Sequence, residues 1–258
     1  MNKNILGDTG INISPLGLGT VKFGRNTGVK YPHDFEIPDD AHLAELLERA
    51  KALGINMLDT APAYGASEEC LGRLLTRQRD EWVIVGKAGE EFDPTIEGGK
   101  SFYNFTAEHF EMSLERSLKR LNTDYIDVLM LHSDGHDVEN LSDEIIAKLQ
   151  DFKSRGMVRA VGASTKTVDG GIRALTHLDC VMAMYTQDYQ DEKAVLDYAA
   201  EHGKGVILKK ALSSGHNTNI DEAFAFSLGH KGVSSVIVGT INPDHLRQNA
   251  EAVSRVLS

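Results

Sequence analysis

The sequence is poor in cysteine, in positive charge and in long apolar runs. With only two cysteines, Cys70 and Cys180, it has no plausible disulfide framework, and both are expected to be small buried side chains. Lys and Arg number 27 against 38 Asp and Glu, and the net charge of −11 argues against nucleic acid or an anionic membrane as a partner. No apolar run approaches the roughly 18 residues of a membrane span, and no basic and apolar leader opens the chain. These absences predict a cytoplasmic protein with no obligate protein partner evident.

What the 258 residues do contain is an alternation of short apolar runs and amphipathic segments. Eight runs rich in Val, Ile and Leu are apolar on both faces, as strands covered by helices are, and lie at 16–19, 56–58, 82–85, 125–131, 158–162, 180–185, 205–208 and 233–238. Helical spacing of apolar residues predicts helices over 40–53, 106–121, 141–152, 191–202, 220–228 and 243–257. Without a linker or a composition shift, this pattern predicts an α/β fold, a single (β/α)8 TIM barrel over residues 1–258.

Two segments stand outside this repeat. Residues 4–6 and 11–13 around the turn 7–10 predict a β-hairpin, which we expect to close the bottom of the barrel. Between the predicted strand at 82–85 and the predicted helix over 106–121, about 18 residues show no repeat pattern, and a structureless loop of that length is usually functional. We predict that this loop covers the substrate, with a plain surface insertion as the alternative. Its aromatic residues are Phe92, Phe102, Tyr103 and Phe105.

Four chemically active side chains stand at or just beyond the ends of predicted strands. Asp59 and Tyr64 share the run Leu-Asp-Thr-Ala-Pro-Ala-Tyr-Gly. Lys87 follows the third strand and His132 follows the fourth. A parallel α/β barrel assembles its chemistry at this end of its strands, so the four are expected to meet.

The four residue types suit proton transfer to a carbonyl oxygen. A free tyrosine titrates near pH ~10 and is a weak acid, but a neighbouring ammonium favours its phenolate. We therefore predict Tyr64 as the general acid, Lys87 as the group that sets its acidity, and Asp59 as the carboxylate that keeps Lys87 charged and oriented. His132 would polarise the substrate oxygen or share the proton of the tyrosine.

The segment after the fourth strand also suggests a metal site. Its candidate ligands are His132, Asp134, His136 and Asp137, which a TIM-barrel metallohydrolase could use. Against this interpretation, a metal site would leave Tyr64 and Lys87 without a role. We expect no metal.

These motifs together resemble the aldo-keto reductase family. The matching stretches, in the order of the family, are residues 17–20, 59–65, 86–87, 113–121, 124–132, 156–162 and 236–249. The resemblance implies reduction of an aldehyde, ketone or small sugar carbonyl to the alcohol, with Asp59, Tyr64, Lys87 and His132 as the catalytic tetrad. It also implies a nicotinamide cofactor, NADP(H) favoured and NAD(H) possible, held without a Rossmann domain, and the sequence has no G-x-G-x-x-G after a strand.

The cofactor site implied by the resemblance departs from the family pattern. Where the family holds the nicotinamide amide with Ser-Asn and Gln, this chain has Ser164, Thr165 and Met182, with Gln187 as a possible substitute for the last. Residues 209–215 occupy the segment that wraps the pyrophosphate, and His245 stands where an arginine often meets the 2′-phosphate. The implied cofactor-binding residues are Gly19, Thr20, Ser164, Thr165, Lys209, Lys210, Leu212, Gly239, Thr240, His245, Gln248 and Asn249.

The substrate is not encoded in a readable motif. Its pocket is expected to include Val21, Lys22, Phe102 and Tyr103. Some members of the superfamily serve as redox-sensing subunits of larger assemblies. The alternative function is therefore a nicotinamide-binding sensor or regulatory subunit with little turnover, which the altered nicotinamide pocket keeps open.

Overall fold

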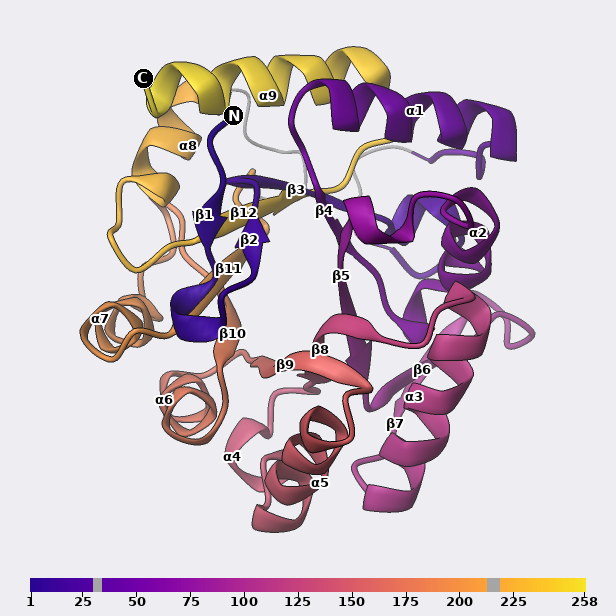
Figure 1. The fold of residues 1–258 in the computed structure, drawn as a ribbon, viewed down its shortest axis with the longest axis vertical. Helices are drawn as coiled ribbons and strands as arrows, with labels where there is room; N and C mark the ends of the chain where they lie inside the picture. Colours follow the sequence, from indigo (N-terminus) through magenta and orange to yellow (C-terminus); the bar gives the residue numbers. More distant parts are fainter. Residues whose placement is uncertain (30–33, 213–218) are drawn as a thin grey trace.

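Eight parallel strands close into a barrel that is surrounded by helices (Figure 1). The structure is a computed structural model, and it describes residues 1–29, 34–212 and 219–258. The barrel strands are β3 (Leu16–Gly19), β4 (Met57–Asp59), β5 (Val83–Ala88), β8 (Ile126–His132), β9 (Val158–Ser164), β10 (Cys180–Met184), β11 (Gly205–Lys209) and β12 (Ser235–Val238). Since β12 pairs with β3, the ring is complete. The predicted (β/α)8 barrel is confirmed, and each predicted strand overlaps an observed one.

The helices cover the outside of the barrel. They are α1 (Asp40–Ala52), α2 (Ser67–Leu74), α3 (Ala107–Leu121), α4 (Asp137–Asn140), α5 (Asp143–Ser154), α6 (Val168–His177), α7 (Lys193–Glu201), α8 (Ile220–Leu228) and α9 (Pro243–Val256). Six of them match the predicted helical ranges, α2 agrees with a helix expected around Cys70, and α4 and α6 were not predicted. Two adjacent glycines weaken the helical signal of α6, but a Cβ on Gly171 would come within 2.6 Å of Val195, so close packing against α7 accounts for glycine there. Among the described residues, no helix is both long and apolar enough to cross a membrane.

The hydrophobic core has two layers. The larger layer lies between the strands and the helices and is rich in leucine. The smaller layer fills the inside of the barrel, as is usual for this fold, and includes Met57, Val85, Val128, Met130, Ala160, Met182 and Ile207. The barrel is therefore packed throughout, and its chemistry is confined to the two ends.

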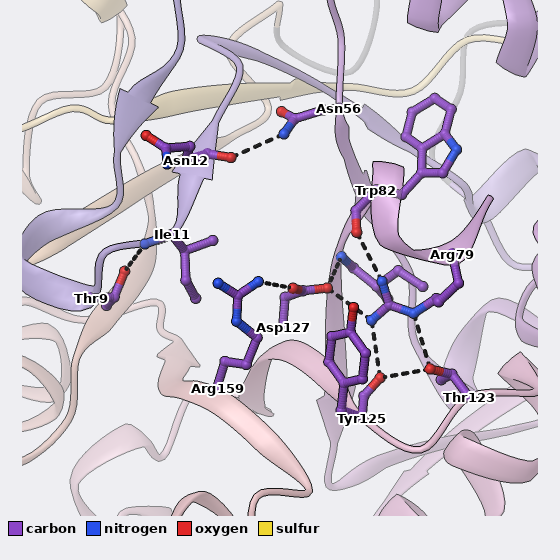
Figure 2. Close-up of polar contacts among 11 residues, drawn as sticks. Thr9, Ile11, Asn12, Asn56, Arg79, Trp82, Thr123, Tyr125, Asp127 and Arg159 are labelled. Carbon is purple, nitrogen blue, oxygen red and sulfur yellow. Dashed lines mark hydrogen bonds and ion pairs between the residues drawn. The ribbon is translucent and has the colours of Figure 1, made fainter.

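The N-terminal hairpin lies across the bottom end of the barrel, where the strands begin (Figure 1). Its strands β1 (Asn4–Ile5) and β2 (Asn12–Ile13) pair antiparallel, as predicted. Leu6, Ile11 and Ile13 join the inner core layer. Just before β4, Asn56 donates from Nδ2 to the Asn12 carbonyl at 2.9 Å (Figure 2), which ties the hairpin to the barrel.

The long connection after β5 is a second hairpin, so the prediction of a structureless loop was wrong. Strands β6 (Glu90–Asp93) and β7 (Lys100–Tyr103) pair antiparallel over four residues each. Glu91 forms an ion pair with Arg116 of α3 and lies 3.2 Å from His109 Nε2 of the same helix, and these contacts hold the hairpin against the barrel wall. The sequence pattern missed it because neither strand is buried on one face, which removes the alternation that marks a strand.

Candidate active site

The four predicted catalytic residues meet at the top end of the barrel, where neighbouring strands β4, β5 and β8 end. The Lys87 ammonium pairs with the Asp59 carboxylate and donates to the Thr60 carbonyl at 3.1 Å. Tyr64 donates from its hydroxyl to Asp59 Oδ2 at 3.3 Å, and Lys87 Nζ lies 4.7 Å from the centre of the Tyr64 ring. The His132 ring stands edge-on to the Tyr64 ring, with centroids 6.2 Å apart. The structure thus brings all four together.

A tight turn places Tyr64. It ends the short 3-10 helix η3 (Pro62–Tyr64), which proline favours at its first position. The next residue, Gly65, has φ +62, and a Cβ there would lie 2.1 Å from the Gly24 carbonyl, so only glycine fits. Arg25 donates to the Ala63 carbonyl at 2.9 Å and fastens the turn from the other side. The sequence pattern did not single out this role of Arg25.

A fifth residue, the carboxylate Glu90, joins the site, and the sequence pattern did not single it out. His132 Nδ1 lies 3.0 Å from Glu90 Oε2, although the ring N–H is not aligned on that oxygen. Burial raises the pKa of Glu90, but contact with His132, a hydrogen bond with Ser101 and the charge of Arg25 outweigh it and hold that pKa at about 2. Burial is also the main reason why the pKa of His132 is lowered, with Glu90 opposing. Glu90 is therefore an ionised carboxylate against a mostly neutral imidazole.

The residues predicted to line the substrate pocket occupy two places. Val21 and Lys22 lie in the 3-10 helix η2 (Val21–Phe23), next to β3. Burial lowers the pKa of Lys22, whose ammonium lies over the Phe35 ring. Phe102 and Tyr103 are adjacent in β7 and so point to opposite faces of the hairpin.

The register of the hairpin decides which of these two aromatic residues faces the site. Tyr103 pairs with Glu90, whereas Phe102 pairs with Glu91, which binds α3. Directly opposed residues of an antiparallel pair share a face, so Tyr103 lies on the face that carries Glu90. Phe102 lies on the face that carries Glu91.

The ends of β9 and β11 form a second polar group beside the tetrad. Lys209 donates from Nζ to Ser164 Oγ at 3.1 Å and to the Thr165 carbonyl at 2.6 Å. Burial lowers the pKa of Lys209 to about 8, against the opposing charge of Glu192. Ser164 is also the register partner of His132, so this group adjoins the tetrad.

Neither Met182 nor Gln187 is placed to hold the nicotinamide amide. Met182 is buried in the inner core layer. Gln187 is exposed and donates to Glu222 of α8 at 3.0 Å, so its amide is already engaged. Near the Met182 position, Ser164, Thr165 and Lys209 therefore remain as polar groups for a nicotinamide amide. Thr165 Oγ1 is buried and has no hydrogen-bond partner among the described residues.

The other cofactor residues implied by the sequence lie along the same end of the barrel. Gly19 ends β3, and the buried Thr20 hydroxyl donates to the Asp59 carbonyl at 2.9 Å, so Thr20 supports the catalytic strand. Lys210 is exposed and has φ +57. The remaining implied residues flank the β11 end or lie between β12 and the first turns of α9, and are Leu212, Gly239, Thr240, His245, Gln248 and Asn249. Of the implied pyrophosphate segment, residues 213–215 lie outside the described residues.

The candidate metal ligands do not converge. Asp137 accepts from the backbone amides of Lys166 and Thr167, at 2.8 and 2.7 Å, while His132 faces Glu90. His136 and Asp134 contact each other at the surface. Within the described ranges, no group of three His, Cys, Asp or Glu side chains could hold a metal ion.

A cavity of about 460 Å³ lies at the bottom end of the barrel, away from the tetrad. Its lining includes Asp127, which pairs with Arg79 and Arg159 (Figure 2). These charges satisfy one another, and among the described residues that line the cavity one buried polar atom lacks a hydrogen-bond partner, the indole Nε1 of Trp82. The active site is therefore assigned to the top end.

Comparison with known proteins identifies the family. The family model "Aldo/keto reductase family" matches residues 15–223. A crystal structure of a putative aldo-keto reductase from Pseudomonas aeruginosa is 49% identical, superposes with a TM-score of 0.90, and the match covers 99% of this chain and 95% of that one.

Curated relatives include both dehydrogenases and reductases. An L-galactose dehydrogenase from Arabidopsis thaliana is 27% identical over 98% of this chain and 88% of its own length. An NADH-specific methylglyoxal reductase from Escherichia coli is 31% identical over 83% of this chain and 68% of its own length. An uncharacterized oxidoreductase from Bacillus subtilis, YqkF, is 32% identical over 64% of this chain, and the match spans 49% of its length. With this family match and a tetrad-bearing barrel, the chain belongs to the aldo/keto reductase family, oxidoreductases that reduce carbonyl groups with NAD(P)H.

Proposed function

We propose that this chain reduces a small aldehyde, ketone or sugar carbonyl and that Tyr64 supplies the proton. The observation that carries the proposal is the contact of Tyr64 with both members of the buried Lys87–Asp59 pair. As the Tyr64 hydroxyl gives its proton to the substrate oxygen, the Lys87 ammonium stabilises the phenolate that remains. Asp59 keeps Lys87 charged and holds its ammonium close to the Tyr64 ring.

The residues at the ends of β9 and β11 fit the amide group of a nicotinamide. An ammonium has three N–H donors, and Lys209 uses two of them on Ser164 and Thr165. The third N–H and the unpartnered Thr165 Oγ1 are suited to the oxygen and nitrogen of a carboxamide. When bound, the reduced nicotinamide supplies the hydride for the carbonyl carbon.

We propose NADP(H) as the favoured cofactor by a narrow margin, with NAD(H) also used. His245 is exposed in the first turn of α9, where a ring N–H and the partial positive charge of the helix N-terminus would meet a 2′-phosphate. Arg247 is engaged by Glu251 and Asp244, at 3.0 and 3.5 Å, and so contributes less. We expect the two cofactors to differ in affinity by less than about tenfold.

Substitution of Tyr64 by phenylalanine tests the proton donor. Carbonyl reduction, followed as NADPH or NADH consumption with a panel of aldehydes, should fall by about 10²- to 10⁴-fold in Tyr64→Phe, because that is the usual contribution of a general acid. The circular dichroism spectrum and the affinity for the cofactor should stay as in wild type. Wild-type rates in Tyr64→Phe would contradict the proposal. A wild-type protein that binds cofactor but turns over no aldehyde of the panel would instead favour the sensor.

A further inference from the structure

Glu90 reaches His132 because of the turn that precedes it. Gly89 has φ +112, and a Cβ there would come within 2.8 Å of the Phe105 ring, so glycine is required. The turn carries the chain from β5 into β6 and sets Glu90 three residues beyond Lys87. The Glu90 side chain is 14% exposed and the His132 side chain 16% exposed, so the contact is largely shielded from water.

The surroundings of His132 favour a neutral ring beside a charged carboxylate. Lys87 of β5 and Lys209 of β11 both face His132 and, with burial, oppose a positive charge on it. Glu90 of β6 acts in the other direction, and Tyr64 presents its ring edge-on. Contact with His132, a hydrogen bond with Ser101 and the charge of Arg25 together hold the pKa of Glu90 at about 2, so its carboxylate is ionised at neutral pH.

A neutral imidazole carries a proton on one of its two nitrogens, and the position of Glu90 determines which nitrogen of His132 that is. An ionised carboxylate only accepts hydrogen bonds, so a ring nitrogen 3.0 Å from it is favoured as N–H. The proton then lies on Nδ1 and leaves Nε2 with a lone pair. The N–H is off the axis of the oxygen in the substrate-free protein, and such hydrogen bonds commonly tighten when substrate binds.

We propose that Glu90 is a positioning residue that holds His132 in its Nδ1–H tautomer, so that Nε2 accepts a hydrogen bond from a substrate hydroxyl. An Nε2 lone pair cannot donate to the carbonyl oxygen, which leaves that oxygen to Tyr64. The substrate class that fits is a carbonyl compound with a hydroxyl on the neighbouring carbon, as in small aldoses. This inference rests on the proposed carbonyl reduction at Tyr64 and specifies which compounds undergo it.

The experiment compares Glu90→Gln with Glu97→Gln, which changes an exposed carboxylate between β6 and β7 of the same hairpin. Two-bond proton–nitrogen NMR of the imidazole should show a protonated Nδ1 and a bare Nε2 on His132 in wild type. Glu90→Gln removes the negative charge and offers Nδ1 a donor as well as an acceptor, so the share of the Nε2–H tautomer should rise. The wild-type preference for glyceraldehyde over propanal, taken as the ratio of kcat/KM values, should fall roughly tenfold in Glu90→Gln, the size of one hydrogen bond, and should be unchanged in Glu97→Gln.

Two results would overturn the role of Glu90. One is an Nε2–H tautomer in wild type, a measurement that needs no variant and no turnover. The other is a Glu90→Gln protein with the wild-type tautomer and the wild-type glyceraldehyde preference. Tyr64→Phe, assayed in parallel, separates the two proposals. Wild-type rates in that variant would contradict Tyr64 as the proton donor but would not affect the NMR evidence on the His132 tautomer.

Discussion

At the bottom of the barrel Asp127 meets two arginines and a backbone amide, whereas at the top His132 meets one carboxylate that is off the axis of its N–H. Asp127 is 2.8 Å from Arg79, 2.6 Å from Arg159 and 2.9 Å from the Ile84 amide (Figure 2). Arg79 in turn donates to the carbonyls of Trp82 and Tyr125. Asp127 and Arg79, the two buried members of this cluster, therefore each make at least three hydrogen bonds.

The top end leaves polar atoms unsatisfied. In the part of the chain that the structure describes, four buried atoms there have no hydrogen-bond partner, namely His132 Nδ1, Thr165 Oγ1, Asp137 Oδ1 and Glu192 Oε2. The bottom has one comparable case, Trp82 Nε1, and the other five such atoms belong to α2 and α3. Buried polar groups in folded proteins are nearly always paired, and the four exceptions at the top lie at the end of the barrel that carries Tyr64 and Lys87, where a ligand would supply the missing partners. The two ends of the barrel therefore differ in how many hydrogen-bond partners their buried polar atoms have, and not in whether they carry charge. We call the bottom the structural end and the top the catalytic end.

Asp127→Asn is the strongest test of the structural end. It leaves the Arg79 guanidinium buried without its counter-charge, which typically costs about 3 to 5 kcal/mol of unfolding free energy. Urea denaturation of wild type and variant would measure this loss. The kcat/KM of the protein that remains folded should be unchanged, because Asp127 lies at the opposite end from Tyr64. A large loss of kcat/KM with normal stability would contradict the division between the two ends.

Lys209→Met tests the catalytic end with a smaller expected effect. Removing an ammonium hydrogen bond to the cofactor should weaken nicotinamide binding by about ten- to a hundredfold, measured by fluorescence titration. Since burial lowers the pKa of Lys209 to about 8, wild-type affinity should decline as the pH rises through that value and the charge is lost. The variant should show no such decline. Lys153→Met, which removes a lysine paired with Asp179 just before β10 at the bottom, is the matched control and should bind the cofactor as wild type does.

The sequence predicted the barrel, and the meeting of the four side chains at its top, because both depend on local pattern. Each barrel strand is a short run of apolar residues, and Asp59, Lys87 and His132 mark strand ends, which a parallel barrel necessarily brings together. Glu90 escaped notice because its contact depends on the register of a hairpin whose strands carry no alternation. No local pattern encodes which residue of that hairpin lies opposite a histidine in β8.

Lys209 is a second residue whose contacts no local sequence pattern encodes. From the sequence it was one of two adjacent lysines after a strand, either of which could have met phosphate. In the barrel β9 and β11 flank β10, and the ammonium reaches across to Ser164 and the Thr165 carbonyl. Its role depends on neighbours that are 44 and 45 positions away in the chain.

Arg159→Ala should have the smallest effect and sharpens the comparison within a single cluster. Arg159 and Arg79 share Asp127, but the Arg159 side chain is 49% exposed and that of Arg79 is 10% exposed. Water and salt screen an exposed charge, so losing Arg159 should cost no more than about 1 kcal/mol of unfolding free energy. Asp127 keeps its buried partner in this variant, whereas Asp127→Asn removes the counter-charge from that partner. Urea unfolding midpoints for the two variants, measured under the same conditions, should therefore differ widely. Equal losses would mean that burial of the partner does not decide the strength of these ion pairs.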